Sequence, residues 1–472
     1  MSASLVGSEM CIRDRYNLYR KKLPAAGLNS TSRPQNFSAE GLTQKTITGQ
    51  AKAFSAVSFR ASLLKETIFQ GQFKTEAMTP KNPKWQLAVT RFSPLEHRKN
   101  DIRTEFERDR NRIMHSEGFD RLRFKTQVFP LSENDMISTR SSHVIQVTDI
   151  ARNISRKLGL NEDLVEAIAL GHDIGHSPFG HDGEKTLKAI CIQNGLAPFW
   201  HEKNSLRMVD KILTLKNTRG KENNLGLTYA VRDGIINHCG EIDENFIKPR
   251  DEFKNLSRLQ SPGQLQPFSW EGIVVKISDK IAYLGRDIED ATKIGILTDK
   301  NQKDLQAIMK KHIPDFEGQV NNTVLMNTFV TDIVKNSSPQ KGIGFSKPVF
   351  DLMNDIKKYN YEHIYLIKGA KSVSQEQCDL VLGTIFDKYS SMYRGKDTLK
   401  FLAKASQSSK YIKNFRNWIV KYTDNDERSK EFENAVIYDL SSHKDYKQAI
   451  VDYISGMTDK YALKTYNNLC NQ

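Results

Sequence analysis

Residues 171–184 read GHDIGHSPFGHDGE, and this stretch decides how the rest of the chain is interpreted. Apolar residues recur at helical spacing just before it, over residues 164–169, so His172 and Asp173 are expected at a helix end. Glycine on both sides of the His-Asp pair lets the backbone bend there. At such a bend two neighbouring side chains can converge on one ion, although a regular helix separates them by about 100°.

The preceding segment has the pattern of an amphipathic helix that begins near His143. Its apolar residues recur at spacings of three and four: Val144, Val147, Ile150, Ile154 and Leu158. Gly159 is expected to end this helix, and Asn161 can cap the next one. His143 therefore lies one helix upstream of the His-Asp pair.

A later segment, about Gly272 to Ile296, predicts a third helix. Its apolar packing stripe has spacings of four, four, three and four: Ile273, Ile277, Ile281, Leu284 and Ile288. Asp279, Tyr283 and Asp287 fall on a separate stripe at i, i+4 and i+8, which can line a pocket. The alternative is a surface position, where Asp279 pairs with the lysine three positions before it or the one directly after it.

Two imidazoles and two carboxylates on these three helices form a set of possible metal ligands. His143, His172, Asp173 and Asp279 offer the nitrogen and oxygen donors that suit a divalent cation such as Mg²⁺, Mn²⁺, Co²⁺, Fe²⁺ or Zn²⁺. Four such ligands leave coordination positions open for water and a phosphate oxygen. The sequence therefore predicts a divalent metal site whose metal is not specified.

The composition is ordinary for a globular protein. Hydrophobic residues make up 38% and charged residues 27% of the 472 positions. The sequence has no continuous apolar run long enough for a membrane span, so no membrane association is expected. The five cysteines lack CxxC spacing, which argues against a disulfide framework and fits a reducing cytoplasm.

The N-terminal fifth of the chain differs from the rest in charge. Residues 1–95 contain 14 Lys and Arg against 5 Asp and Glu, so they supply +9 of the net charge of +14. This excess leaves a single-stranded nucleic-acid partner open as a hypothesis. Met1–Arg15 resembles a translated sequencing adapter, while Phe54–Phe69 can form a helix. We expect residues 1–92 to be an artefact or a disordered leader outside the catalytic core.

Five fragments resemble the HD-domain deoxynucleoside triphosphate triphosphohydrolases, above all the bacterial dGTPase-like group. They occur in family order: FERDRNRIMHSEGFDRLRFKTQVFP, TRSSHVIQV, GHDIGHSPFGHDGE, FWHEKNSLRMV and VVKISDKIAYLGRDIEDA. The resemblance implies an all-α fold, with an HD-domain catalytic core over residues 93–300. The additional C-terminal helical region, residues 301–472, is expected to complete the pocket and to support contacts in a homo-oligomer.

The resemblance also implies roles for individual residues. The residues that match metal ligands are His143, His172, Asp173 and Asp279. The residues that match the catalytic group are His181, Glu184 and His201. The residues that match substrate contacts are Gln127, Arg140, Lys280, Tyr283 and Asp287. Among the remaining histidines, His176 is either structural or a partner of the ligands, and His238 beside Cys239 is interpreted as structural.

The implied reaction cleaves a deoxynucleoside triphosphate at the α-phosphorus and releases a deoxynucleoside and intact triphosphate. A polyanionic substrate needs cations around its tail, which Arg140 and Lys280 can supply. The leaving 5′-oxygen needs a proton, and His181 is the expected general acid, oriented by Glu184.

Two other functions remain open from the sequence. One is another HD-type hydrolysis, on a nucleoside monophosphate, a cyclic nucleotide or an alarmone. The other is a nucleic-acid-binding regulator that retains a silent HD scaffold, for which no aromatic-basic RNA motif or recognition helix is visible.

Overall fold

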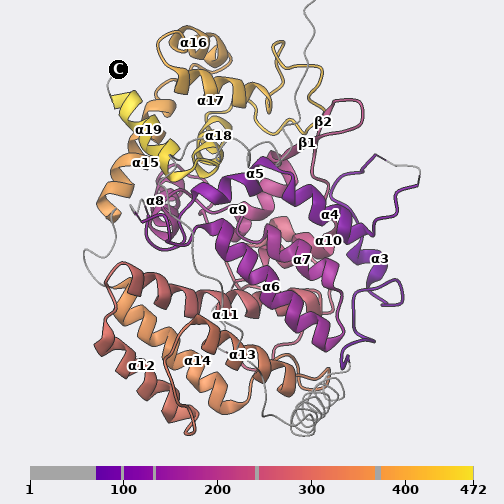
Figure 1. Cartoon of the computed structure of the whole chain (residues 1–472). Coiled ribbons are helices and arrows are strands. Elements are labelled where there is room, and N and C mark those ends of the chain that lie inside the picture. The colour runs from indigo at the N-terminus through magenta and orange to yellow at the C-terminus, as the bar shows by residue number, and fades with distance from the viewer. Residues whose placement is uncertain (1–70, 97–99, 131–133, 240–243, 367–373, 471–472) are drawn as a thin grey trace, which may run out of the picture. The chain divides into compact units, whose positions relative to one another are not determined.

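Three helices carry or directly precede the predicted metal ligands, and they pack on one another in the computed structural model (Figure 1). They are α6 (Arg140–Leu158), α7 (Glu162–Gly171) and α11 (Trp270–Lys293). The fold is all-α apart from one short two-stranded sheet among the described residues, which confirms the predicted class. The predicted start and end of the third helix, Gly272 and Ile296, differ from the observed ends by two and three residues.

The described residues all belong to one unit, which spans residues 65–472. They are residues 71–96, 100–130, 134–239, 244–366 and 374–470. The helix expected at Phe54–Phe69, and the remainder of residues 1–70, lie outside the described residues.

The turn between α6 and α7 forms as its residues predict. Gly159 ends α6 with a positive φ of 82°, a conformation that glycine adopts at little cost. A Cβ at Gly159 would stand 2.7 Å from the Cα of Gly71, so the close approach of the two backbones also requires glycine. The Asn161 side chain accepts hydrogen bonds from the backbone N–H groups of Asp163 and Leu164.

Residues 71–92 were expected in the leader, and for them that prediction is wrong. Phe73 and Met78 are buried in the core cluster. The Phe73 backbone N–H donates to the Leu158 carbonyl at 2.8 Å, and the Met78 N–H donates to Glu271 at 2.8 Å. Apart from α3 (Trp85–Ala88), this segment is built from turns, so its buried residues show no helical period in the sequence.

The charged segment near residue 105 forms α4 (Glu105–Met114), which begins with a capping box from Thr104 and Glu107. The helix is more than a solvated surface element. Asp109 is fully buried, pairs with Arg91 and accepts the Thr228 backbone N–H at 2.7 Å. Two short helices follow: α5 (Glu117–Arg121) and the 3-10 turn η1 (Leu122–Phe124).

Shorter elements lie between α7 and α11 along the chain. They are α8 (Gly180–Gln193), α9 (His201–Arg207), the π-helix η2 (Met208–Ile212), antiparallel strands β1 (Thr214–Lys216) and β2 (Glu222–Asn224), α10 (Tyr229–Ile236) and the 3-10 turn η3 (Leu256–Arg258). Helices α9 and α10 pack on each other, and α10 also packs on α7 and α11.

Residues 299–470 form two groups of helices that pack on different parts of the core. The first group contacts α11 and contains α12 (Asp299–His312), α13 (Asn322–Asn336), α14 (Lys347–Asn360) and the π-helix η4 (Tyr361–Tyr365). The second group contacts α8 and contains α15 (Gln375–Ser390), α16 (Thr398–Ala405), α17 (Lys410–Val420), α18 (His443–Ser455) and α19 (Asp459–Cys470). None of the described helices is both long and apolar enough to span a membrane.

Candidate metal centre and active site

The four residues predicted as metal ligands lie together, although α6, α7 and α11 are far apart in sequence. His143 Nε2 lies 2.9 Å from Asp279 Oδ1. His172 Nε2 lies 3.7 Å from Asp173 Oδ1 and 3.9 Å from Asp279 Oδ1. The alternative pairing of Asp279 with Lys276 is not observed, because Lys276 is buried and donates to Gln266 at 3.0 Å.

The unpaired atoms of this cluster fit a divalent cation. His172 Nδ1 donates to the Ala169 carbonyl at 2.6 Å, which leaves its buried Nε2 without a hydrogen bond. His143 Nδ1 is likewise buried without a partner. Burial lowers the pKa of His172 to about 4, so the ring is neutral and has a lone pair to offer.

The carboxylates of the cluster are ionised. Burial opposes this, but the hydrogen bond and charge of His143 lower the pKa of Asp279 to about 2. Burial likewise opposes ionisation of Asp173, and the Arg140 guanidinium outweighs it and holds the pKa of that carboxyl well below its usual range. Neutral imidazole beside ionised carboxylates is the donor set that a divalent cation requires.

Two further histidines lie at the cluster. His176 Nε2 is 3.2 Å from Asp173 Oδ1, and the His176 ring stacks on the His201 ring with centroids 3.9 Å apart. The His238 ring lies 4.9 Å from the His172 ring, and His238, His172 and Asp279 form one possible ligand group. His238 is not part of any motif with ligand spacing, because it is tertiary packing at the end of α10 that brings it here.

The residues of the predicted catalytic group also lie together, around one carboxylate. Glu184 Oε2 lies 3.5 Å from His181 Nδ1 and 3.1 Å from His201 Nδ1. Glu184 Oε1 accepts the His201 backbone N–H at 3.0 Å. Burial lowers the pKa of His201, but the carboxylates of Glu202 and Glu184 outweigh it and raise this pKa to about 9. His201 is therefore a cation at neutral pH.

The turn before α8 determines where His181 lies. Phe179 and Gly180 both have positive φ angles, 62° and 59°. A Cβ at Gly183 would stand 1.8 Å from the Pro178 carbonyl oxygen, so only glycine allows the turn to close on the first turn of the helix. The His181 side chain is 67% exposed at the end of this turn.

Arg140 and Gln127 present buried polar atoms that have no partner in the protein. Arg140 is 2% exposed, and its Nη1 donates to Asp173 at 2.6 Å. Its Nε and Nη2 are buried without hydrogen bonds, as is the Oε1 of Gln127. Leaving the buried N–H donors of a guanidinium without hydrogen bonds costs free energy. The Nε and Nη2 of Arg140 therefore indicate that an anionic ligand binds here.

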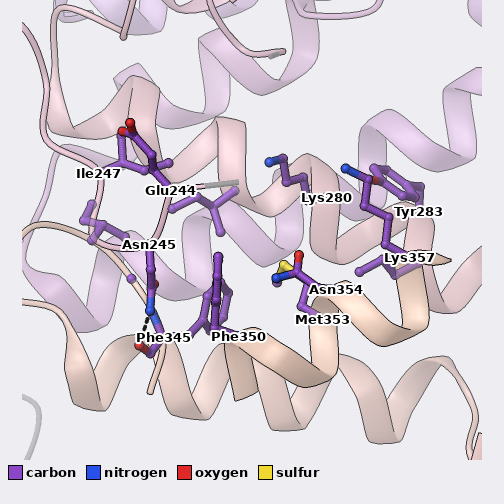
Figure 2. Close-up of a pocket in the computed structure, with 14 residues that line it drawn as sticks. Glu244, Asn245, Ile247, Lys280, Tyr283, Phe345, Phe350, Met353, Asn354 and Lys357 are labelled. Carbon is purple, nitrogen blue, oxygen red and sulfur yellow. Dashed lines mark hydrogen bonds between the residues drawn. The ribbon is translucent and has the colours of Figure 1, made fainter. Parts of the chain in front are cut away.

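Lys280 and Tyr283 line a cavity between α11 and α14 (Figure 2). Lys357 of α14 lines the same cavity, and its cationic side chain was not anticipated from the sequence. Phe350 and Met353 contribute an apolar wall. The cavity therefore joins two predicted substrate contacts to a further lysine.

One carboxylate oxygen of Asp287 accepts a hydrogen bond, and the other has no hydrogen-bond partner. The Tyr365 hydroxyl of η4 donates to Asp287 Oδ2, while Asp287 Oδ1 is buried without a hydrogen bond. Burial raises the pKa of Asp287 to about 7, against the opposing effect of the Tyr365 bond. The unpaired oxygen can accept a hydrogen bond from a ligand hydroxyl.

The chain is similar to known protein families and to named proteins. The HD domain matches residues 140–284, and a phosphohydrolase-associated domain matches residues 389–468. A deoxyguanosinetriphosphate triphosphohydrolase-like protein of Caldanaerobacter subterraneus subsp. tengcongensis is 36% identical over 376 residues, covering 79% of this chain and 87% of the relative. Proteins of the same name from Clostridium tetani and Thiobacillus denitrificans are 32% and 30% identical, covering 79% and 78% of this chain and 88% and 91% of those relatives.

Proposed function

Because the chain belongs to the HD-domain family of deoxyguanosinetriphosphate triphosphohydrolase-like proteins, we propose that it hydrolyses deoxynucleoside triphosphates to a deoxynucleoside and triphosphate. The observation that supports this most directly is that the metal cluster adjoins the His181–Glu184–His201 group. His176 joins the two, since it contacts Asp173 and stacks on His201. The first cluster would hold the cation that activates a water, and the second cluster would protonate the leaving oxygen of the same phosphoryl group.

His143, His172, Asp173 and Asp279 would hold the divalent cation. When bound, such a cation supplies Lewis-acid activation of water and of a phosphoryl oxygen. The protein orients the ligands itself: the Ala169 carbonyl fixes the tautomer of His172, and Arg140 keeps Asp173 ionised.

The polyanionic tail of the substrate would bind to cationic side chains around the cluster. Arg140 offers its unpaired Nε and Nη2, and the cationic His201 ring stacks on His176. Lys280 and Lys357 add positive charge along the cavity that they line. Charge-assisted hydrogen bonds of this kind are roughly twice as strong as neutral ones.

His181 would donate the proton to the leaving 5′-oxygen. Its Nδ1 faces Glu184, which leaves Nε2 to carry the proton towards the substrate. The Glu184 carboxylate, 3.5 Å from Nδ1, would set the orientation of the ring. Water supplies the oxygen that joins the α-phosphorus, and the bond from that phosphorus to the 5′-oxygen breaks as the proton arrives.

The sugar would bind between Gln127, Tyr283 and Asp287. Asp287 Oδ1 and Gln127 Oε1 are both buried acceptors without partners, as required to receive a sugar hydroxyl. Tyr365 holds Asp287 in place through its other oxygen. A homo-oligomeric state and a cytoplasmic location belong to the same proposal and rest on the family resemblance and on the lack of CxxC spacing among the cysteines.

The test is a panel of deoxynucleoside and ribonucleoside triphosphates with Mg²⁺, Mn²⁺ or Co²⁺, with products identified by phosphorus NMR. Tripolyphosphate with a deoxynucleoside is the expected result. Orthophosphate or pyrophosphate, with a nucleotide as the second product, would contradict the proposal and favour another HD-type hydrolysis.

A further inference from the structure

The junction between α18 and α19, in the C-terminal part of the chain, lies against two segments of the candidate active site. Asp459, the first residue of α19, is 4% exposed. Its Oδ1 accepts the backbone N–H of Phe179 at 3.0 Å, and its Oδ2 accepts the backbone N–H of Thr126 at 3.0 Å. One buried carboxylate thus ties together two loops that are more than fifty residues apart in sequence.

Both of these loops carry residues of the site. Thr126 directly precedes Gln127, whose Oε1 is buried without a hydrogen bond. Phe179 precedes α8 and lies two positions before His181. Phe179 is also one of the few non-glycine residues with a positive φ among the described residues. Such a conformation persists where surrounding contacts hold it, and the bond to Asp459 is one of them.

Other buried bonds from the same junction reach the same loops. Lys125 donates from its Nζ to the carbonyls of Ser455 and His176, the first at 2.8 Å. Asn204 on α9 donates to Ser455 Oγ at 3.2 Å and to the Gly175 carbonyl at 2.7 Å. The α18–α19 junction therefore contacts the segment before Gln127, the segment before His181 and the helix that begins at His201.

We propose that Asp459 is a positioning residue, which holds the Gln127 segment and the His181 turn in their catalytic arrangement. This inference rests on the proposed function of those two residues. A carboxylate is suited to the task because each of its oxygens accepts one of the two N–H groups. An amide at this position offers one acceptor and turns a donor towards the other N–H.

Metal binding serves as the control that distinguishes this positioning role from a general loss of structure. Asp459 has no hydrogen bond to His143, His172, Asp173 or Asp279, which are carried by α6, α11 and the end of α7. A positioning role therefore predicts that changes at Asp459 slow the reaction while the protein still binds metal. A general loosening of the fold would reduce metal binding as well.

The experiment compares Asp459→Asn and Asp459→Ala with the matched control Asp445→Asn in the full chain. Asp445 lies on α18 and accepts the Asp439 N–H, and it makes no hydrogen bond to either loop. We expect kcat for deoxynucleoside triphosphate hydrolysis to fall on the order of 10²-fold in the alanine variant and less in the asparagine variant, with Mn²⁺ binding unchanged. The control should keep the parent kcat. Parent kcat in the alanine variant, or a parallel loss of Mn²⁺ binding, would overturn the inference.

Amide hydrogen exchange separates this inference from the proposed function. Thr126 and Phe179 should lose protection in Asp459→Asn and keep it in Asp445→Asn. If the parent protein fails to hydrolyse any deoxynucleoside triphosphate, the proposed function falls, and the exchange result still decides whether Asp459 holds the two loops. Unchanged protection at both amides would show that it does not.

Discussion

The two clusters of the site differ in how they are held and how exposed they are. His143, His172 and Asp173 are each at most 3% exposed, and their bonds run among themselves and to the helices that carry them. His181 is 67% exposed and stands on a turn with two residues at positive φ. The proposed metal ligands are thus held in place by the protein alone, whereas we expect the proposed proton donor to be brought into place by the substrate and by the elements behind its turn.

The largest expected effect comes from removing a residue of the buried cluster. His172→Ala should abolish detectable metal binding and reduce turnover by more than the roughly 10⁴-fold upper range of a lost general acid. Isothermal titration with Mn²⁺ and steady-state kinetics would measure both. The control is His115→Ala, an exposed histidine of another segment, which should leave both values unchanged. Metal binding of parent strength in His172→Ala would show that the cluster has been assigned wrongly.

The next effect comes from the exposed side chain of the second cluster. His181→Ala should keep metal binding and lose about 10²–10⁴-fold in kcat, because the leaving oxygen no longer receives its proton. A leaving group with a lower pKa, such as a p-nitrophenyl ester of triphosphate, should recover much of the rate. Full activity of His181→Ala on deoxynucleoside triphosphates would contradict the role of this histidine.

A smaller effect is expected at the sugar side of the site. Asp287→Asn keeps the shape but weakens the acceptor for a sugar hydroxyl and changes its bond with Tyr365. We expect KM to rise about tenfold, which corresponds to the loss of one hydrogen bond of ordinary strength. Asp387→Asn on the exposed face of α15 serves as the control. An unchanged KM would place the sugar elsewhere.

The smallest effect is the pH dependence of stability at His201. Its pKa is about 9 in the folded protein, above the ordinary value of 6.5, so the stabilisation is complete below pH 6.5 and is lost as the pH rises towards 9. For this single group, the free energy of unfolding cannot change by more than about 1.4 kcal/mol per pH unit. The difference in Tm between the parent and His201→Gln should therefore shrink from pH 6.5 to pH 9. A difference that is independent of pH would contradict the charge assigned to His201.

Features that depend on neighbouring residues in the chain could be predicted from the sequence. The helix stop at Gly159, the cap at Asn161 and the stripe of Asp279 and Asp287 all follow from local backbone preference and helical period. The family resemblance then named the residues that the structure brings together around Glu184.

Features that depend on packing between distant segments could not be predicted. His238, Tyr365 and Asp459 reach the site from elements with no motif of their own, and only the folded arrangement joins them to it. Residues 71–92 were assigned to a leader because turns leave no periodic pattern, although Phe73 and Met78 are buried. In both cases the sequence does not show which distant segment of the chain each residue packs against.

The most direct test of the central claim is hydrolysis of a deoxynucleoside triphosphate in water enriched in oxygen-18, with mass spectrometry of both products. Attack at the α-phosphorus, as we propose, places one labelled oxygen in the triphosphate and none in the deoxynucleoside. Label in orthophosphate or pyrophosphate, or in the 5′-hydroxyl of the deoxynucleoside, would contradict it.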